Sequence, residues 1–190
     1  FKIRKLSARV KTNKDRHAYV DPALSSTVME AMPNLVWRLR WTLMRYQGLR
    51  VASEMNELRW SEVDWKRQTI RIRSPKTAYI EGKESRLSAI MPQVFPLLQE
   101  MFEAADDGAE FVLPRLAYKN YRKFFQKYLK RAGITPWPAL FNNLRKSAVT
   151  DAHDIWPPHV CDAFFGHSET IFRECYGQVT EEHFQKARSL

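Results

Sequence analysis

The chain has 190 residues, of which 44% are hydrophobic and 27% are charged, and this composition excludes a wholly disordered protein. No apolar run approaches the roughly 20 residues of a membrane-spanning helix, and residues 1–14 lack the apolar core of a signal peptide. We therefore expect a cytoplasmic protein with no membrane partner. Its 31 Lys and Arg outnumber its 21 Asp and Glu, and the net charge of +10 favours a polyanionic partner.

The N-terminal part is predicted to be a basic arm followed by helices. Residues 1–20 have no periodic apolar pattern, so we expect a linker there. Apolar spacing then predicts helices at 26–32 and 35–46, the second ended by Gly48. A third, short helix is expected at about 50–58.

In the middle of the chain, the spacing of apolar residues changes from a helical to an alternating pattern. Residues 63–65, 68–74 and 86–91 alternate apolar with polar side chains, which predicts a small antiparallel sheet. The segment 74–85 is too long and polar for a tight turn, so it should project from the sheet as a loop. Such loops often carry function.

The remainder is predicted to be helical, which makes the architecture mainly α with one small antiparallel β-sheet. The expected helices are 94–105, 118–132, 139–155, 158–166, 169–176 and 181–190.

The positive charge is concentrated in two stretches. Residues 1–16 carry seven basic groups and one acidic group, and residues 115–131 carry seven basic groups and no acidic group. A solubilising surface would explain a modest excess. The clustering favours nucleic acid, and neither stretch has the strong apolar face of a helix that lies on a membrane surface.

Two short segments contain candidate anion-binding side chains. Arg50 follows Gly48 at the expected start of a helix, where backbone N–H groups already favour an anion, and Glu54 could hold its guanidinium. Asn142 and Arg145 are three positions apart on an expected helix, so both side chains leave the same face. Taken alone, an ordinary surface pair explains Arg50 and Glu54 better than a functional site does, and Asn142 or Arg145 alone would be unremarkable.

Three further residues complete the set of candidates. Lys76 lies in the projecting loop, where a lone lysine is usually just solvated. In the segment FFGHSETIFRECYGQV, His167 precedes Tyr176 by nine positions. Alone, they could be a capping or core histidine and a buried tyrosine with a satisfied hydroxyl.

The order of these elements resembles the catalytic domain of the tyrosine recombinases, or phage-type integrases. An arginine in a GLR turn, a lysine in a hairpin loop, an LR pair on a helix, and a Gly-His pair followed by a tyrosine occur in that family's order from about residue 25 onward. The resemblance implies a helical catalytic domain over residues 21–190, with residues 1–20 as a linker from a separate core-binding domain.

The resemblance also implies a role for each residue. Tyr176 would be the nucleophile, Arg50 and Arg145 would clamp the phosphate, Lys76 would be the general acid, and His167 would assist at the phosphate. The product would be a 3′-phosphotyrosyl link and a free 5′-hydroxyl, with no metal, ATP or other cofactor.

One position departs from the family pattern. Asn142 stands where the family has the histidine of its HxxR motif, and an amide can bond a phosphate oxygen but cannot exchange a proton near neutral pH. Glu54 would support Arg50, although the GLR segment carries an extra residue before it.

The partner implied by the resemblance is double-stranded DNA, bound by four protomers on paired sites in the nucleoid of a prokaryote or a phage-like element. Segment 180–190 would dock on a neighbouring protomer. The residues expected to contact DNA phosphates are Lys119, Arg122, Lys123, Lys127, Lys130 and Arg131.

Two other functions remain open. A DNA-binding regulator on the same fold would have lost strand cleavage, with Asn142 as the first sign of that loss. A type IB topoisomerase-like protein would cleave and religate without strand exchange. We favour the recombinase because its other candidate residues occur together.

Overall fold

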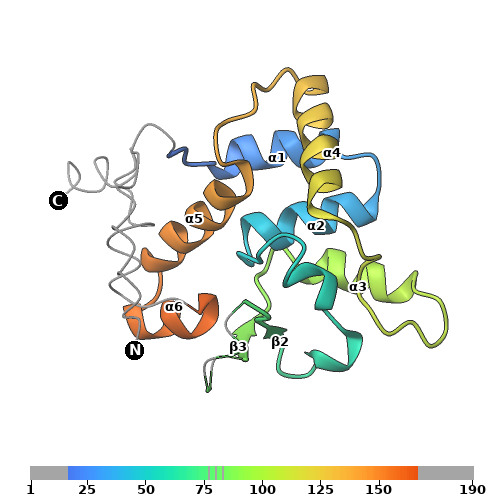
Figure 1. Ribbon diagram of the computed structural model, residues 1–190, viewed down its shortest axis with the longest axis vertical. Coiled ribbons are helices and arrows are strands. Elements are labelled where there is room, and N and C mark those ends of the chain that lie inside the picture. The colour runs from blue at the N-terminus through green and yellow to red at the C-terminus, as the bar shows by residue number, and fades with distance from the viewer. Residues whose placement is uncertain (1–16, 77, 80, 83, 167–190) are drawn as a thin grey trace, which may run out of the picture.

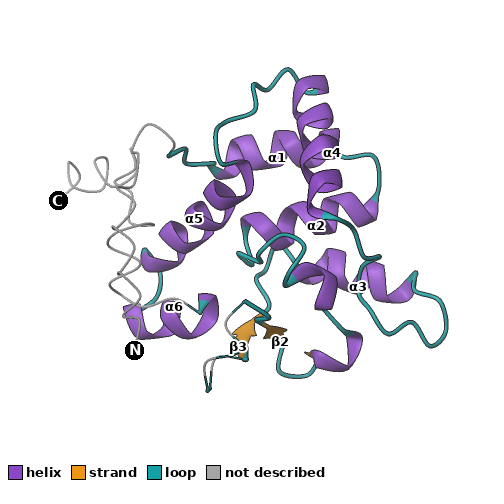
Figure 2. Cartoon of the chain, viewed as in Figure 1, coloured by secondary structure: helices purple, strands orange, loops and turns teal. Residues whose placement is uncertain are grey.

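The computed structural model describes residues 17–166 with the exception of residues 77, 80 and 83. Within these residues it has six α-helices and one three-stranded sheet. Figure 1 and Figure 2 show the helices arranged around the small sheet of β2 (Thr69–Arg73) and β3 (Ser85–Ala89). The mainly helical architecture with a small antiparallel sheet is confirmed. The predicted helices 169–176 and 181–190, together with His167 and Tyr176, lie outside the described residues.

Two capped helices open the described fold. Helix α1 (Pro22–Ala31) begins after Asp21, whose side chain accepts a hydrogen bond from the Leu24 N–H at 2.7 Å. Helix α2 (Leu35–Arg45) begins after Asn34, which caps the Trp37 N–H at 3.2 Å. Such caps satisfy N–H groups that have no partner within the helix. Both predicted helices are confirmed.

The third predicted helix, at 50–58, is wrong. The chain instead forms turns over residues 51–54, with Ala52 in the left-handed region at φ 62°, and a single 3-10 turn, η2 (Met55–Glu57). Glu54 and Met55 are adjacent and both are fully buried, at 1% and 0% exposure. A residue in the left-handed region cannot continue a right-handed α-helix, so the helix is interrupted at Ala52.

A second 3-10 turn, η3 (Trp60–Glu62), leads into the sheet of β1 (Val63–Asp64), β2 (Thr69–Arg73) and β3 (Ser85–Ala89). The strands are antiparallel in the order β1-β2-β3. Ile70 and Ile72 of β2 point into the core, while the alternate residues Arg71 and Arg73 are exposed. The predicted sheet and its intervening loop are confirmed.

Four more helices complete the described fold: α3 (Phe95–Glu103), α4 (Tyr118–Arg131), α5 (Leu140–His153) and α6 (Pro158–Phe165). Helix α2 packs against both α3 and α5, and α6 packs against α5 and β3. In Figure 1, α6 lies beside the sheet and α5 leads down to α6, whereas α1 and α4 lie together at the opposite end of the molecule. Helices α5 and α6 therefore bring the later part of the chain to the sheet.

Residues 17–20 are held against α5. The Tyr19 hydroxyl donates to Asp151 at 2.7 Å, and the Val20 N–H donates to the Ser147 hydroxyl at 2.9 Å. Arg45, fully buried on α2, donates to the Val20 carbonyl and to Asp151, both at 2.7 Å. The chain therefore enters the fold along α5.

Within the part of the chain that the structure describes, none of the helices has the length and apolar character required to cross a membrane.

Candidate functional site

The carboxylate of Glu54 is the centre of the candidate site. One of its oxygens accepts a hydrogen bond from the Arg50 N–H at 2.9 Å, and the other forms an ion pair with the Arg50 guanidinium. From the sheet, Arg86 reaches both oxygens at 2.8 Å. The Glu54 side chain is 1% exposed and that of Arg50 is 24% exposed, so Arg50 carries the charge of this cluster toward the surface.

The charges around Glu54 determine its pKa. Burial alone raises the pKa of this carboxyl, but hydrogen bonds and charge from Arg86, with the charges of Arg145 and Arg50, outweigh burial and bring the pKa to about 2. The carboxyl is therefore ionised at neutral pH. The guanidiniums of Arg50 and Arg86 bond this buried anion, and the charge of Arg145 acts on it as well.

Replacing Glu54 with glutamine should change how stability depends on pH. Because the folded-state pKa lies near 2, below the ordinary 4.5, the charge stabilises the fold above pH 4.5 and that contribution is lost as the pH falls toward 2. The contribution is about 3 kcal/mol, most of it lost by about pH 3. Urea unfolding of wild type and Glu54→Gln at stepped pH should show a difference that shrinks over this window. A constant difference would contradict the assignment.

Arg145 joins three parts of the chain from α5. Its side chain donates to the Gly48 carbonyl, 97 positions away, and to the Phe165 carbonyl at the end of α6. The residue is 5% exposed. A guanidinium has five donors in a fixed plane, so these two bonds set its orientation. The structure thus brings Arg145, the GLR turn and the α6 terminus together.

Gly48 lies where this arrangement leaves no room for a side chain. Its φ is +64°, and an added Cβ would come within 2.7 Å of the Phe165 ring. Gly48→Ala should therefore destabilise the fold by about 2 kcal/mol or more, since it adds left-handed strain to a steric clash. Thermal unfolding measures the change. Gly108→Ala is the matched control, because Gly108 also has a positive φ but meets nothing within 4 Å.

The other described candidates lie in exposed positions. Asn142 is exposed near the start of α5, while Arg145, one turn later, is buried. Lys76 is exposed in the turn that follows β2. The expectation that Arg50 lies at the start of an α-helix is wrong, because the segment after it turns instead, so a helix terminus supplies no anion site there.

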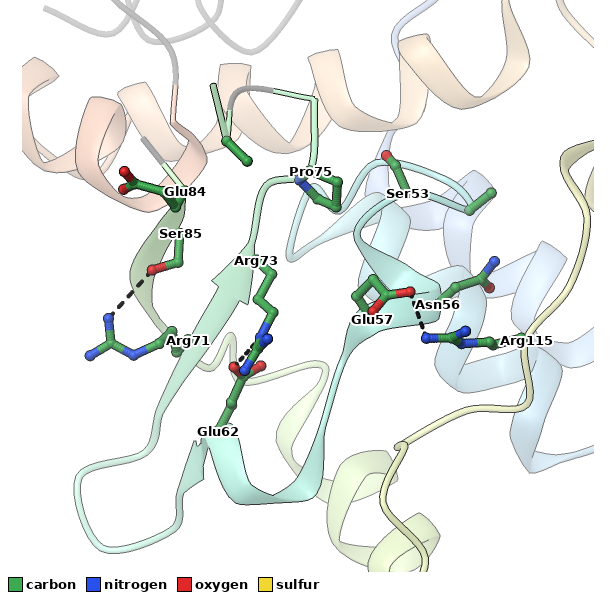
Figure 3. Close-up of a pocket in the computed structure, with 12 residues that line it drawn as sticks. Ser53, Asn56, Glu57, Glu62, Arg71, Arg73, Pro75, Glu84, Ser85 and Arg115 are labelled. Carbon is green, nitrogen blue, oxygen red and sulfur yellow. Dashed lines mark hydrogen bonds and ion pairs between the residues drawn. The ribbon is translucent and has the colours of Figure 1, made fainter. Parts of the chain in front are cut away.

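An open hollow of about 790 Å³ lies between the η2 segment and the sheet. Figure 3 shows Arg73 paired with Glu62 at 2.6 Å and Arg115 paired with Glu57 at 2.9 Å at its wall. Ser53, the neighbour of Glu54, and Pro75, the neighbour of Lys76, also line it. The hollow therefore adjoins both the Arg50 turn and the projecting loop.

Helix α4 carries the basic face predicted from the sequence. Tyr121, Phe125 and Leu129 bury its apolar side. The exposed basic residues on it are Lys119, Arg122, Lys123, Lys127, Lys130 and Arg131.

Arg86 is the site residue that the sequence interpretation missed. On β3, inward-facing and outward-facing positions alternate, and Arg86 shares the buried face with Ser88. A charged residue at an inward-facing position of a strand requires a buried partner. No such signal was present in the sequence, because the alternation in RLSAIM predicts that Leu87 rather than Arg86 faces inward, whereas Leu87 is 52% exposed in the structure.

Among the described residues, no group of three or more His, Cys, Asp or Glu side chains could hold a metal ion. Cys161 is fully buried on α6, and burial first, then the charge of Asp162, raises the pKa of its thiol to about 11. This cysteine is therefore not a nucleophile near neutral pH.

The fold is that of the tyrosine recombinase catalytic domain. XerA recombinase superposes with a TM-score of 0.75 at 16% identity, over 94% of this chain and 66% of that one. The Tn1549 transposon integrase, in complex with transposon right end DNA, gives a TM-score of 0.70 at 16% identity, over 95% of this chain and 67% of that one. A lambda integrase dimer bound to a COC′ core site gives a TM-score of 0.65 at 18% identity, over 86% of this chain and 49% of that one.

The family model of the phage integrase family matches residues 24–183. The chain belongs to this family. It spans just under two thirds of the XerA chain. A search of curated proteins found no match.

Proposed function

We propose that this chain forms the strand-cleaving centre of a site-specific DNA recombinase. The observation that carries the proposal is that Arg50 pairs with the buried carboxylate of Glu54 while Arg145 bonds the Gly48 carbonyl, two residues before Arg50. Two oriented guanidiniums suit a phosphodiester, because negative charge grows on the non-bridging oxygens as phosphorus becomes five-coordinate. The partial exposure of Arg50 gives it access to such a phosphate.

In the proposed reaction, the Tyr176 oxygen attacks phosphorus and the bond to the 5′-oxygen breaks. The phenol passes its proton to His167 or to water, and Lys76 donates one to the departing 5′-oxygen. A phenol with a pKa of about 10 is a moderate nucleophile and later a good leaving group, so the step is reversible. The new phosphotyrosyl bond keeps the energy needed for rejoining, and ATP is not consumed. His167 assists at the phosphate or in proton movement.

Asn142 has a more limited role in this proposal than the histidine of the family pattern. Its exposed amide donates a hydrogen bond to a phosphate oxygen, without proton transfer. Lys76 and His167 then carry out the proton transfers.

The substrate we propose is duplex DNA. The Tn1549 integrase forms a complex with transposon right end DNA, and a lambda integrase dimer binds a COC′ core site. The basic face of α4 contacts phosphates, and such contacts position the duplex without reading its sequence. For the assembly, we propose four protomers on paired sites, with segment 180–190 docked on a neighbour.

The decisive experiment incubates the protein with a nicked duplex of its recombination site, so that cleavage releases a short strand and traps the enzyme. We expect a covalent protein–DNA adduct, seen as a band resistant to denaturation. A duplex of scrambled sequence serves as the control. Tight binding without an adduct would instead establish a regulator, and an adduct without exchange between two sites would establish a topoisomerase-like protein.

A further inference from the structure

Arg86 on β3 uses its whole guanidinium within the protein. Besides the two bonds to Glu54, its Nε donates to the Phe164 carbonyl at 2.9 Å and its Nη1 donates to the Ser74 hydroxyl at 3.0 Å. All three nitrogens are thus engaged, and the side chain is only 6% exposed. These bonds leave Arg86 in a fixed orientation, with no nitrogen directed at solvent.

These contacts join the segments that carry other candidate residues. Glu54 leads to Arg50, Ser74 begins the loop that contains Lys76, and Phe164 lies at the end of α6, just before the Gly-His pair. A Cβ added to Gly166 would meet the Arg86 Cδ at 3.1 Å, so the backbone there lies directly on this side chain. One guanidinium therefore links three segments that are distant in sequence.

We propose that Arg86 is a positioning residue that sets the geometry of the cleavage centre, an inference that rests on the proposed function. It does not touch the DNA. Through its bidentate pair with Glu54 it fixes the direction of the carboxylate, and through Glu54 it fixes Arg50. Its bonds to Ser74 and Phe164 place the neighbouring loop and the end of α6 relative to that arginine. Bidentate pairs impose direction as well as attraction.

Loss of Arg86 should also make the cleavage rate depend on the protonation of Glu54. In the described part of the chain, the charged groups around Glu54 are Arg50, Arg86 and Arg145. Removing Arg86 leaves the carboxyl buried but without its largest counter-charge, so its pKa rises. As the pH falls, Glu54 then becomes protonated and Arg50 loses its ion-pair partner.

The test measures the single-turnover rate of adduct formation on the nicked duplex, at saturating DNA and across pH 5.5–9, for Arg86→Met and Arg86→Lys. We expect Arg86→Met to lower the rate on the order of 100-fold, because small misplacements of a reacting group carry penalties of that size. Arg86→Lys keeps the positive charge but lacks the planar fork of donors. Its cleavage rate should be about tenfold higher than that of Arg86→Met. Duplex affinity should stay near that of wild type.

The pH profile separates positioning from folding. The Arg86→Met rate should fall toward low pH, and adding Glu54→Gln should remove that dependence. Arg67→Met is the matched control. The Arg67 side chain is 82% exposed, so this variant should cleave like wild type.

Wild-type rates in both Arg86 variants would overturn the positioning role alone, as would a loss that matches the unfolded fraction at every pH. If Arg86→Met does not fold, Arg86→Lys carries the test, and a wild-type rate in that variant overturns the proposal. A wild-type protein that forms no adduct would instead overturn the proposed function, and the positioning role with it.

Discussion

Replacing Tyr176 with phenylalanine is expected to abolish covalent capture of the nicked duplex. The change deletes only the oxygen that would bond to phosphorus, and no water-mediated reaction yields a protein–DNA link. Duplex affinity should change by less than about fivefold, because one neutral hydrogen bond contributes ~1 kcal/mol. The adduct is quantified on denaturing gels, and affinity is measured by fluorescence anisotropy.

Tyr128→Phe is the matched control for that experiment. Tyr128 lies on α4, half-buried and stacked on Phe124, so the loss of its hydroxyl should leave capture intact. Proteolysis of the wild-type adduct followed by mass spectrometry should place the nucleotide on Tyr176. An adduct that persists in Tyr176→Phe, or a nucleotide mapped to another tyrosine, would refute the nucleophile assignment.

Replacing Arg145 with alanine should lower the cleavage rate on the order of 10²–10³-fold, the effect of losing one oriented donor at a developing oxyanion. A second effect should accompany it. The carbonyls of Gly48 and Phe165 lose their buried donor, and each such loss costs about 1–3 kcal/mol. The variant should therefore be both inactive and less stable.

The two effects of Arg145→Ala are separated by assaying at a temperature where unfolding curves show the variant to be folded. Arg67→Ala is the control, because this exposed arginine should change neither cleavage nor stability. If the folded variant cleaves at the wild-type rate, Arg145 is purely a structural residue and the phosphate clamp must be assigned elsewhere.

The periodic segments of the chain were predictable from the sequence. The alternation in TIRIR specified which residues of β2 face the core, and the 3.6-residue spacing of Tyr121, Phe125 and Leu129 specified the buried side of α4. Both follow from local geometry repeated over several residues, so one sequence is enough to reveal them.

The turn after Arg50 was not predictable in the same way. Its path depends on the need to bury Glu54 beside Arg86 and to bury Met55 in the core at once. That requirement arises from residues over 30 positions away, as the 32-residue separation of Glu54 and Arg86 illustrates. Local propensity favoured a helix, and tertiary pairing overrode it.

The expectation that the candidate residues lie close together did not come from periodicity alone. Periodicity placed Asn142 and Arg145 on one helix, but nothing in the residues themselves placed that helix against the GLR turn. The resemblance to tyrosine recombinases supplied that expectation. The structure brings Arg145 to the Gly48 carbonyl and, through Glu54, into the charge cluster of Arg50. Tyr176 and His167 remain predictions.

The two carbonyl bonds of Arg145 have a consequence for the order of events during synthesis. They require Gly48, Arg145 and Phe165 to be present and packed together, so the arginine cluster is incomplete until the ribosome has released nearly the whole described chain. A partly synthesised molecule therefore has the basic residues of α4 but lacks the assembled arginine cluster.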